Sequence, residues 1–232
     1  MKCFISCLTF LLLINCSTFN LALAAEDDLG LWTPIYIKLP VTKKIIGNFE
    51  VNTRLQENIT DINQLLIRPS IGYKLNENLS VWQGHAWISS YLPRFIREQR
   101  IWQQILHEKH FSKFDLMNRT RFEERFIQNV EGVSLRGRHF LRAGYVLDKN
   151  KIWSLIISNE LFVNLNSHFQ GPQAGIDQNR VFAGINKKIN NNFNFDLGYQ
   201  LQYINNQAPA RDRLNHVILA NFYIDLPSLL KE

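Results

Sequence analysis

Charged side chains recur at every second position in two neighbouring segments near the middle of the chain. The residues with this spacing are Arg119, Arg121, Glu123, Arg125, Arg136, Arg138 and Arg142. A guanidinium group is a planar fork of N–H donors that binds carboxylates in a bidentate manner. The chemistry available to this set is therefore ion pairing with acidic side chains or recognition of a small anion.

The spacing also predicts the elements that hold these groups. A β-strand directs successive side chains to opposite faces, so a period of two indicates strands. The positions of opposite parity include apolar residues such as Phe122, Phe126, Leu141 and Tyr145. We therefore expect residues 116–147 to form a hairpin with one arginine-rich face and one apolar face.

The same alternation covers most of the chain and is clearest in residues 193–203. Eleven segments of about 9–13 residues show it, and none shows the 3.6-residue period of a helix over any length. Because single-chain bacterial barrels have even strand numbers, we expect about 10 or 12 strands. Removing segment 28–38, which Pro34 weakens, gives the lower number, and dividing residues 79–107 differently gives the higher one.

Alternation alone fits two kinds of closed sheet. A soluble barrel buries its apolar face, whereas a membrane barrel turns that face to lipid and keeps the polar face in a wet lumen. Charge on the polar face of many strands and aromatic residues near strand ends favour the second. We predict an all-β fold, a closed antiparallel up-and-down transmembrane β-barrel of roughly 10–12 strands with a polar charged lumen. A soluble periplasmic β-protein is the alternative, since Glu124 and His139 fall on the expected lipid face and suit a membrane barrel only near the interface.

Residues 1–24 have the pattern of a signal peptide. Lys2 precedes an apolar run over residues 4–13, and Ala22-Leu23-Ala24 has the small-x-small form of a cleavage site. The apolar run is too short to span a membrane as a helix. Cys16 offers a lipoprotein alternative, which the residue before it fits poorly. We expect export through the Sec pathway to the bacterial outer membrane.

Removal of this segment leaves residues 25–232 as one β-barrel domain. All three cysteines precede residue 25, so the mature chain has no disulfide and no thiolate metal site. Lys2 is the one charged residue removed, so the net charge falls from +6 to +5. The cationic residues alternate along strands rather than forming runs, which makes nucleic acid a poor partner.

The expected hairpin register defines a network of charges in the lumen. We expect Phe126 to lie near Leu135 across the connecting loop. The facing residues are then Arg125 and Arg136, Glu123 and Arg138, and Arg119 and Arg142, with Glu160 beside Arg138. Opposite charges on facing strands stabilise by roughly 0.2–1 kcal/mol per pair, and like charges destabilise. Arg180, in segment 177–188, completes the network.

This network has two interpretations. In the first, Glu123, Arg138 and Glu160 form an ion-pair ladder that fills a narrow lumen, as in a structural or surface-binding barrel with a plugged lumen. In the second, the lumen is a narrow passage for anions or small solutes, because arginines outnumber acids and Arg125 with Arg136 lacks a partner. The expected partners are outer-membrane lipid, the barrel assembly machinery and, for a passage, a small anionic solute, with no nucleic acid.

The histidines and serines do not indicate catalysis. A lipid hydrolase needs a serine next to a histidine base that a third polar group orients. Ser167 and His168 are adjacent in a predicted loop, and the histidines show no ligand spacing suited to a strand. We expect no catalytic residue, no metal and no cofactor, and hence no enzyme. A lipid-modifying barrel enzyme is an alternative, and so is binding through loops 166–176 and 205–213.

Four segments, in order along the chain, resemble a known family. They are residues 118–126 (NRTRFEERF), 159–164 (NELFVN), 177–184 (DQNRVFAG) and the pair Asn215-His216. Together they resemble an uncharacterised bacterial family, domain of unknown function 2490, over most of the mature chain. Its members are predicted outer-membrane β-barrels, so the resemblance implies the fold and the location. It implies no activity and no site residue.

Overall fold

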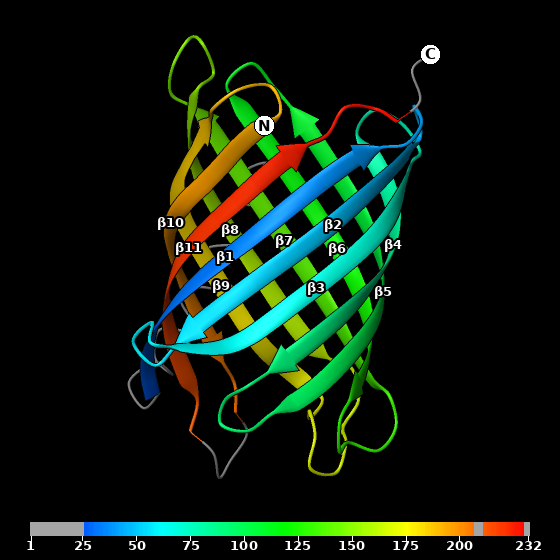
Figure 1. The fold of residues 1–232 in the computed structure, drawn as a ribbon, viewed down its shortest axis with the longest axis vertical. Coiled ribbons are helices and arrows are strands. Elements are labelled where there is room, and N and C mark those ends of the chain that lie inside the picture. The colour runs from blue at the N-terminus through cyan, green and yellow to red at the C-terminus, as the bar shows by residue number, and fades with distance from the viewer. Residues whose placement is uncertain (1–25, 207–210, 230–232) are drawn as a thin grey trace, which may run out of the picture.

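The computed structural model describes residues 26–206 and 211–229, which form a closed barrel of eleven strands (Figure 1). The strands are β1 (Glu26–Pro40), β2 (Ile45–Gln56), β3 (Asp61–Lys74), β4 (Leu79–Ser90), β5 (Ile96–His110), β6 (Phe114–Ile127), β7 (Ser134–Val146), β8 (Trp153–Asn164), β9 (Gly175–Lys188), β10 (Phe193–Ile204) and β11 (Arg213–Asp225). In this described part of the chain, no helix is long and apolar enough to cross a membrane. The predicted signal peptide, with its three cysteines, lies outside the described residues.

The number of strands is odd, so the expectation of an even number is wrong. Strands joined in order by hairpins alternate in direction, and with an odd number the first and the last point the same way. β1 and β11 therefore close the barrel as a parallel pair, from Glu26 opposite Arg213 to Lys38 opposite Asp225. The other neighbouring strands of the barrel pair antiparallel. The prediction of an antiparallel sheet is thus wrong at the closing seam alone.

Pro34 interrupts the seam but does not remove the strand. Paired residues along the seam run to Trp32 and resume at Ile35. Proline has no N–H to donate to a ladder, which explains a gap at this point. On its other side β1 stays in register, with Pro34 opposite Asn52 of β2.

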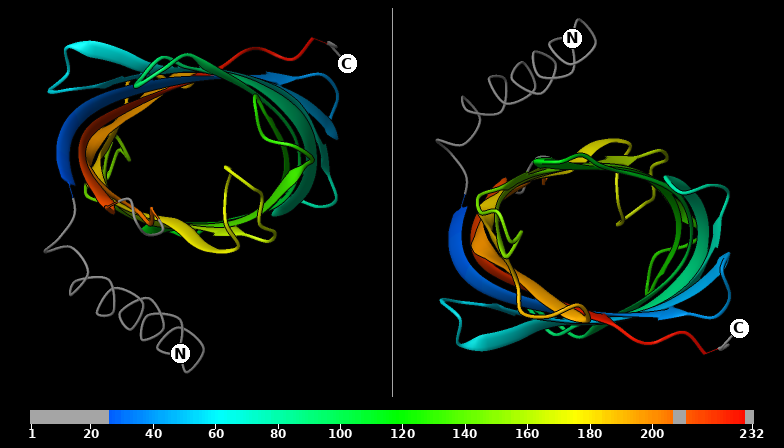
Figure 2. Two further views of the ribbon diagram at one scale, coloured as in Figure 1. Left: turned by 90° about the horizontal axis from the view of Figure 1, so that it is seen from below. Right: turned by 90° about the horizontal axis from the view of Figure 1, so that it is seen from above.

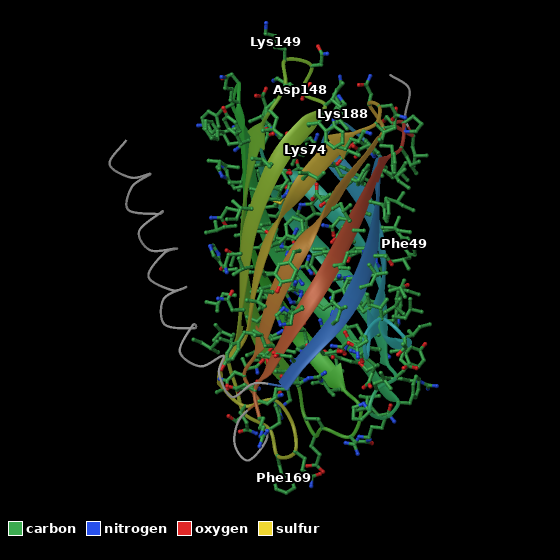
Figure 3. The ribbon with its side chains drawn as sticks, turned by 90° about the vertical axis from the view of Figure 1, so that its left-hand side faces the viewer. Phe49, Lys74, Asp148, Lys149, Phe169 and Lys188 are labelled. Carbon is green, nitrogen blue, oxygen red and sulfur yellow. The ribbon has the colours of Figure 1, made fainter. Side chains whose placement is uncertain are left out.

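Side chains alternate between the interior and the outer surface around the barrel. On β6, Arg121 and Glu123 are buried, whereas Phe122 and Phe126 are exposed. Figure 3 shows Phe49 of β2 on the outside of the barrel. The predicted separation of a charged face from an apolar face is therefore confirmed for the central hairpin.

The interior is a mixed core rather than a purely polar lumen. One buried apolar cluster consists of Trp32, Ile156, Phe182, Val217 and Leu219. A smaller one consists of Leu66, Ala86 and Ile88. These residues lie on the same faces of their strands as the charged ones, so apolar side chains fill space between the ion pairs. The expectation of a polar charged lumen was therefore incomplete.

The two ends of the barrel differ in their connections. The end where β1 begins, here called the long-loop end, carries connections 57–60, 91–95, 128–133 and 165–174, and β10 ends and β11 begins at the same end. The opposite, short-turn end carries connections 41–44, 75–78, 111–113, 147–152 and 189–192. Figure 3 shows Phe169 at the long-loop end and Lys74, Asp148, Lys149 and Lys188 at the short-turn end. Seen along its axis, the ring of strands is oval (Figure 2).

Candidate functional site

A buried carboxylate, Glu123 of β6, lies at the centre of the interior network. Its side chain is 1% exposed, and Arg136 Nη2 lies 2.6 Å from its Oε2. Arg138 Nη1 lies 2.6 Å from its Oε1, and Arg138 Nη2 lies 2.7 Å from Glu160 Oε1 on β8. Arg119 Nη2 reaches the same Glu160 oxygen at 2.6 Å. The structure thus joins β6, β7 and β8 by a continuous ladder of ion pairs.

The facing residues differ from the expected ones, because the β6–β7 register is shifted by two positions. The observed facing pairs are Glu123 and Arg136, Arg121 and Arg138, Arg125 and Ser134, Met117 and Arg142, and Arg119 and Phe140. The expected facing pairs between these strands are therefore wrong. A shift of two leaves each side chain on its own face, since the strand period is two. The expected ladder members consequently meet diagonally rather than directly opposite.

Arg125 and Arg136 both have carboxylate partners, which contradicts the expectation that they lack one. Arg125 Nε lies 2.6 Å from Glu98 Oε1. Arg136 Nη1 lies 3.0 Å from Asp177 Oδ2, in addition to its contact with Glu123. Glu98 and Asp177 were not predicted as partners, because β5 alternates weakly and Asp177 stands at the edge of a predicted loop. The available signal for Glu98 was its position two residues before Arg100, which places both side chains on the same face of the strand. In the structure Arg100 Nε lies 2.6 Å from Glu98 Oε1.

Further ion pairs lie along the interior on both sides of the ladder. Arg142 Nη2 lies 3.2 Å from Asp196 Oδ1, and the Tyr223 hydroxyl donates to Asp196 Oδ2 at 2.8 Å. Arg68 of β3 pairs with Glu50 of β2. Asp196 is nearest the short-turn end, since β10 starts three residues before it. The interior charges therefore extend over much of the barrel length.

Three arginines rely on aromatic rings and amides more than on carboxylates. Arg54 and Arg180 lie over the same Trp32 ring, with Cζ 3.9 Å and 4.8 Å from the ring centroid. Arg121 lies over Trp102 at 3.9 Å and donates from Nε and Nη2 to Gln104 Oε1. Such contacts contribute up to about 2 kcal/mol when desolvated. The interior position of Trp32 and Trp102 was not predicted from the sequence.

Arginines outnumber carboxylates in this network. The arginines are Arg54, Arg68, Arg100, Arg119, Arg121, Arg125, Arg136, Arg138, Arg142 and Arg180. The carboxylates are Glu50, Glu98, Glu123, Glu160, Asp177 and Asp196. Ten arginines against six carboxylates leave four positive charges without a carboxylate of their own.

Side chains fill much of the interior and leave a cavity of about 100 Å³. Its charged lining residues are Arg54, Arg68, Arg119, Arg138, Arg142, Arg180, Glu50, Glu160 and Asp196. The remainder of the wall includes Trp32, Tyr36, Phe140, Phe182 and Tyr223. This cavity is several times the roughly 15 Å³ that one water requires.

The serine and histidine of the predicted loop support its conformation. Ser167 Oγ accepts a hydrogen bond from the Ala174 N–H at 2.9 Å, and His168 Nε2 lies 3.0 Å from the Val133 carbonyl oxygen. On the outer face, His216 Nδ1 contacts the Tyr199 hydroxyl. In the described part of the chain, no three His, Cys, Asp or Glu side chains are grouped so that they could hold a metal ion.

The fold and its interior define a closed β-barrel with an arginine–carboxylate core. The chain belongs to the family described as protein of unknown function (DUF2490), whose model matches residues 29–215. The predicted resemblance is therefore confirmed. An uncharacterized protein of Methylorubrum extorquens is 33% identical over 181 residues, covering 75% of this chain and 78% of that one. No solved structure matches the chain.

Proposed function

We propose that the chain is an integral β-barrel of the bacterial outer membrane. The observation that supports this is that each strand exposes apolar side chains on its outer face. In order from β1 to β11, examples are Ile35, Phe49, Ile71, Trp87, Ile105, Phe122, Tyr145, Ile157, Ile176, Leu197 and Ile218, which are 37–58% exposed. Soluble monomers rarely expose a continuous apolar patch above a few hundred Å². A band of apolar side chains around the outside of a barrel is stable in contact with the hydrocarbon of a bilayer.

The strand lengths and an outer groove agree with this proposal. A membrane-spanning strand needs roughly 9–11 residues, and these strands have 12–15. An outer groove of about 630 Å³ is lined chiefly by apolar residues, among them Ile71, Tyr73, Ile105 and Phe122. A groove of this composition suits the acyl chain of a lipid.

Membrane fractionation tests the location. After separation of cell envelopes, we expect the full-length protein in the outer-membrane fraction, resistant to extraction with alkaline carbonate. Recovery in the soluble periplasmic fraction would support the soluble alternative and overturn the proposal.

We further propose that the lumen is closed and that the barrel acts by binding rather than by bulk passage of solutes. The observation behind this is the filled interior, in which Glu123 is 1% exposed and the cavity measures about 100 Å³. We expect no steady conductance when the purified barrel is inserted into a planar bilayer. An ohmic conductance would overturn the closed lumen.

A narrow anion passage is the second candidate, because the interior network holds four more arginines than carboxylates. The same bilayer measurement distinguishes it. A conductance whose reversal potential in a salt gradient shows anion preference would support this candidate.

We also propose that the protein is not an enzyme. The group most similar to a catalytic arrangement is on the outer face, where His216 contacts Tyr199 and its Nε2 lies 3.8 Å from Asp27 Oδ1. Incubation of the purified barrel with labelled phospholipid and labelled lipid A tests this directly. We expect no product, and a product lost in His216→Ala would establish the lipid-modifying alternative.

A further inference from the structure

We propose that the interior cavity is a binding site for one small oxyanion, such as phosphate or sulfate, held between Arg54 and Arg180. This inference goes beyond the proposed membrane role and does not depend on it, because it concerns the barrel interior alone. The cavity wall carries six arginines and three carboxylates, an excess of three positive charges.

The carboxylates of the wall already have arginine partners. Glu50 pairs with Arg68, and Asp196 pairs with Arg142. Glu160 Oε1 receives both Arg119 and Arg138, at 2.6 Å and 2.7 Å. The two arginines of the wall outside these close pairs are Arg54 and Arg180.

Arg54 and Arg180 both line the cavity, share an aromatic neighbour and are weakly compensated. Both guanidinium groups lie over the ring of Trp32. Arg54 Nη1 donates to the neutral Gln64 amide at 2.9 Å, and Arg180 Nη1 is 3.8 Å from Glu160 Oε2. A buried charge without a close counter-charge is strongly destabilising. An anion between the two guanidinium groups would supply that counter-charge.

The unpaired polar groups of the wall also favour an acceptor-rich ligand. Five wall donors in the described structure have no hydrogen-bond partner, namely Trp32 Nε1, Arg54 Nε, Arg68 Nε, Arg119 Nε and Gln200 Nε2. Asn52 Oδ1 is the unpaired wall acceptor. Water would offer donors and acceptors equally, whereas an oxyanion offers acceptors in excess. The volume of about 100 Å³ suits a small oxyanion rather than a nucleotide.

Binding of inorganic phosphate to the full barrel in detergent micelles tests the site. At constant ionic strength, we expect phosphate to raise the unfolding temperature in a saturable manner and to broaden its ³¹P resonance. Sulfate is expected to compete, and chloride is not. An equal effect of chloride, or no ³¹P broadening with the wild-type barrel, would overturn the proposal.

Matched variants locate the phosphate within the barrel. We expect Arg54→Gln combined with Arg180→Gln to weaken phosphate binding at least tenfold. Arg94→Gln, in an exposed loop at the long-loop end, removes one positive charge outside the cavity and should leave binding unchanged. Equal binding by the double variant and the wild type would place the anion elsewhere. If the double variant does not fold, competition between phosphate and sulfate in the wild type still decides whether the site exists.

A different observation carries a second inference, which rests on the proposed membrane location. Each lysine of the described chain lies at or near the short-turn end, where the strands end or turn. They are Lys38, Lys43, Lys44, Lys74, Lys109, Lys113, Lys149, Lys151, Lys187 and Lys188. We infer that this rim binds the phosphate groups of anionic phospholipid.

Contacts with aromatic rings place several of these lysines where a headgroup would lie. Lys44 Nζ lies 5.9 Å from the Tyr73 ring centroid, and Lys187 Nζ lies 4.7 Å from that of Trp153. Aromatic residues concentrate at membrane interfaces, and lysine stems extend along apolar surface towards the polar layer. Short turns face the periplasm in bacterial barrels, so the expected lipid is phospholipid of the inner leaflet.

Lipid selectivity in reconstituted vesicles tests the rim. With spin-labelled lipids, we expect the barrel to select phosphatidylglycerol over phosphatidylcholine by several-fold at low salt, and to lose this preference at high salt. Changing Lys44, Lys109 and Lys187 to Gln should abolish the selection, whereas Arg94→Gln should preserve it. If the triple variant inserts with unchanged selectivity, the inference about the rim is overturned and the proposed membrane location is not. If the wild-type barrel does not insert, the result counts against the membrane location. Selection of lipid A instead of phosphatidylglycerol would also overturn it.

Discussion

Arg138 of β7 and Glu123 of β6 form a buried ion pair, with Nη1 2.6 Å from Oε1, although neither residue faces the other in the strand register. Arg138 faces Arg121, and Glu123 faces Arg136. The diagonal contact therefore relieves the repulsion of two facing arginines. It also links the two strands through side chains in addition to the backbone ladder.

Removal of the Glu123 charge should strongly destabilise the barrel. Glu123→Gln leaves Arg136 and Arg138 without their shared carboxylate, and loss of one partner from a buried pair costs roughly 3–5 kcal/mol. Urea unfolding of the reconstituted barrel measures the change. Glu131→Gln, in an exposed loop, is the control and should stay within about 0.5 kcal/mol of the wild type. Equal stability of the two variants would contradict the buried network.

Phe162 should stabilise the interior in two separable ways. Its ring is 1% exposed and lies beneath the guanidinium groups of Arg138 and Arg180, each 4.5 Å from its centroid. Phe162→Ala leaves a cavity and should cost about 3–5 kcal/mol. Phe162→Leu keeps most of the volume and should lose chiefly the cation–π contribution, about 0.5–2 kcal/mol. A Phe162→Leu variant as stable as the wild type would show that the ring acts by volume alone.

A charge on the outer face distinguishes a lipid surrounding from water. Leu197 is 44% exposed in the middle of β10's outer face, and Leu197→Arg should cost roughly 2–4 kcal/mol if it lies near the bilayer midplane. Leu75→Arg, in a turn at the barrel end, should cost about 0–1 kcal/mol. Reversible unfolding from lipid vesicles supplies both values. If Leu197→Arg is neutral, the outer face does not contact hydrocarbon.

Asp148 should give one turn at the short-turn end a pH-dependent stability. Its carboxylate accepts hydrogen bonds from the backbone N–H groups of Trp153, Ile152 and Asn150, and these bonds, that of Trp153 above all, lower its pKa. Because the folded pKa lies below the unfolded one, the stabilisation is present above the unfolded value and is lost as pH falls through the folded value. Carboxyl ¹³C titration measures the pKa, and amide exchange at Trp153 should accelerate in Asp148→Asn. A carboxyl that titrates as in an unfolded peptide would refute the prediction.

Much of the fold follows from local sequence. The alternation that predicts strands also predicts that Arg121 and Glu123 share a face and that Phe122 lies opposite. A side chain's face depends on its parity within its own strand, so this inference survives an error in register. The alternation predicts eleven segments, which is the number of strands in the structure. The expectation of 10 or 12 strands came from the even strand numbers of bacterial barrels and not from the sequence.

The partners within the site were less accessible to sequence reasoning. Glu98 of β5 pairs with Arg125 of the next strand, β6, and Asp177 of β9 pairs with Arg136 two strands away on β7. Arg180 of β9 reaches Trp32 because the barrel closes β1 onto β11, whereas Arg54 faces Trp32 from the neighbouring strand β2. No local pattern in the chain encodes these distances, since they depend on the curvature of the sheet and on side-chain packing in its interior.

The sequence by itself determined the strands, the separation of a charged face from an apolar face, and the family. The tertiary structure alone decided the parallel closing seam, the ion-pair partners and the small size of the cavity. The physical reason is that the face on which a side chain lies depends on the two-residue repeat within its own strand. The ion-pair partner that the side chain meets depends instead on the register between strands. A shift of two residues preserves the first and changes the second.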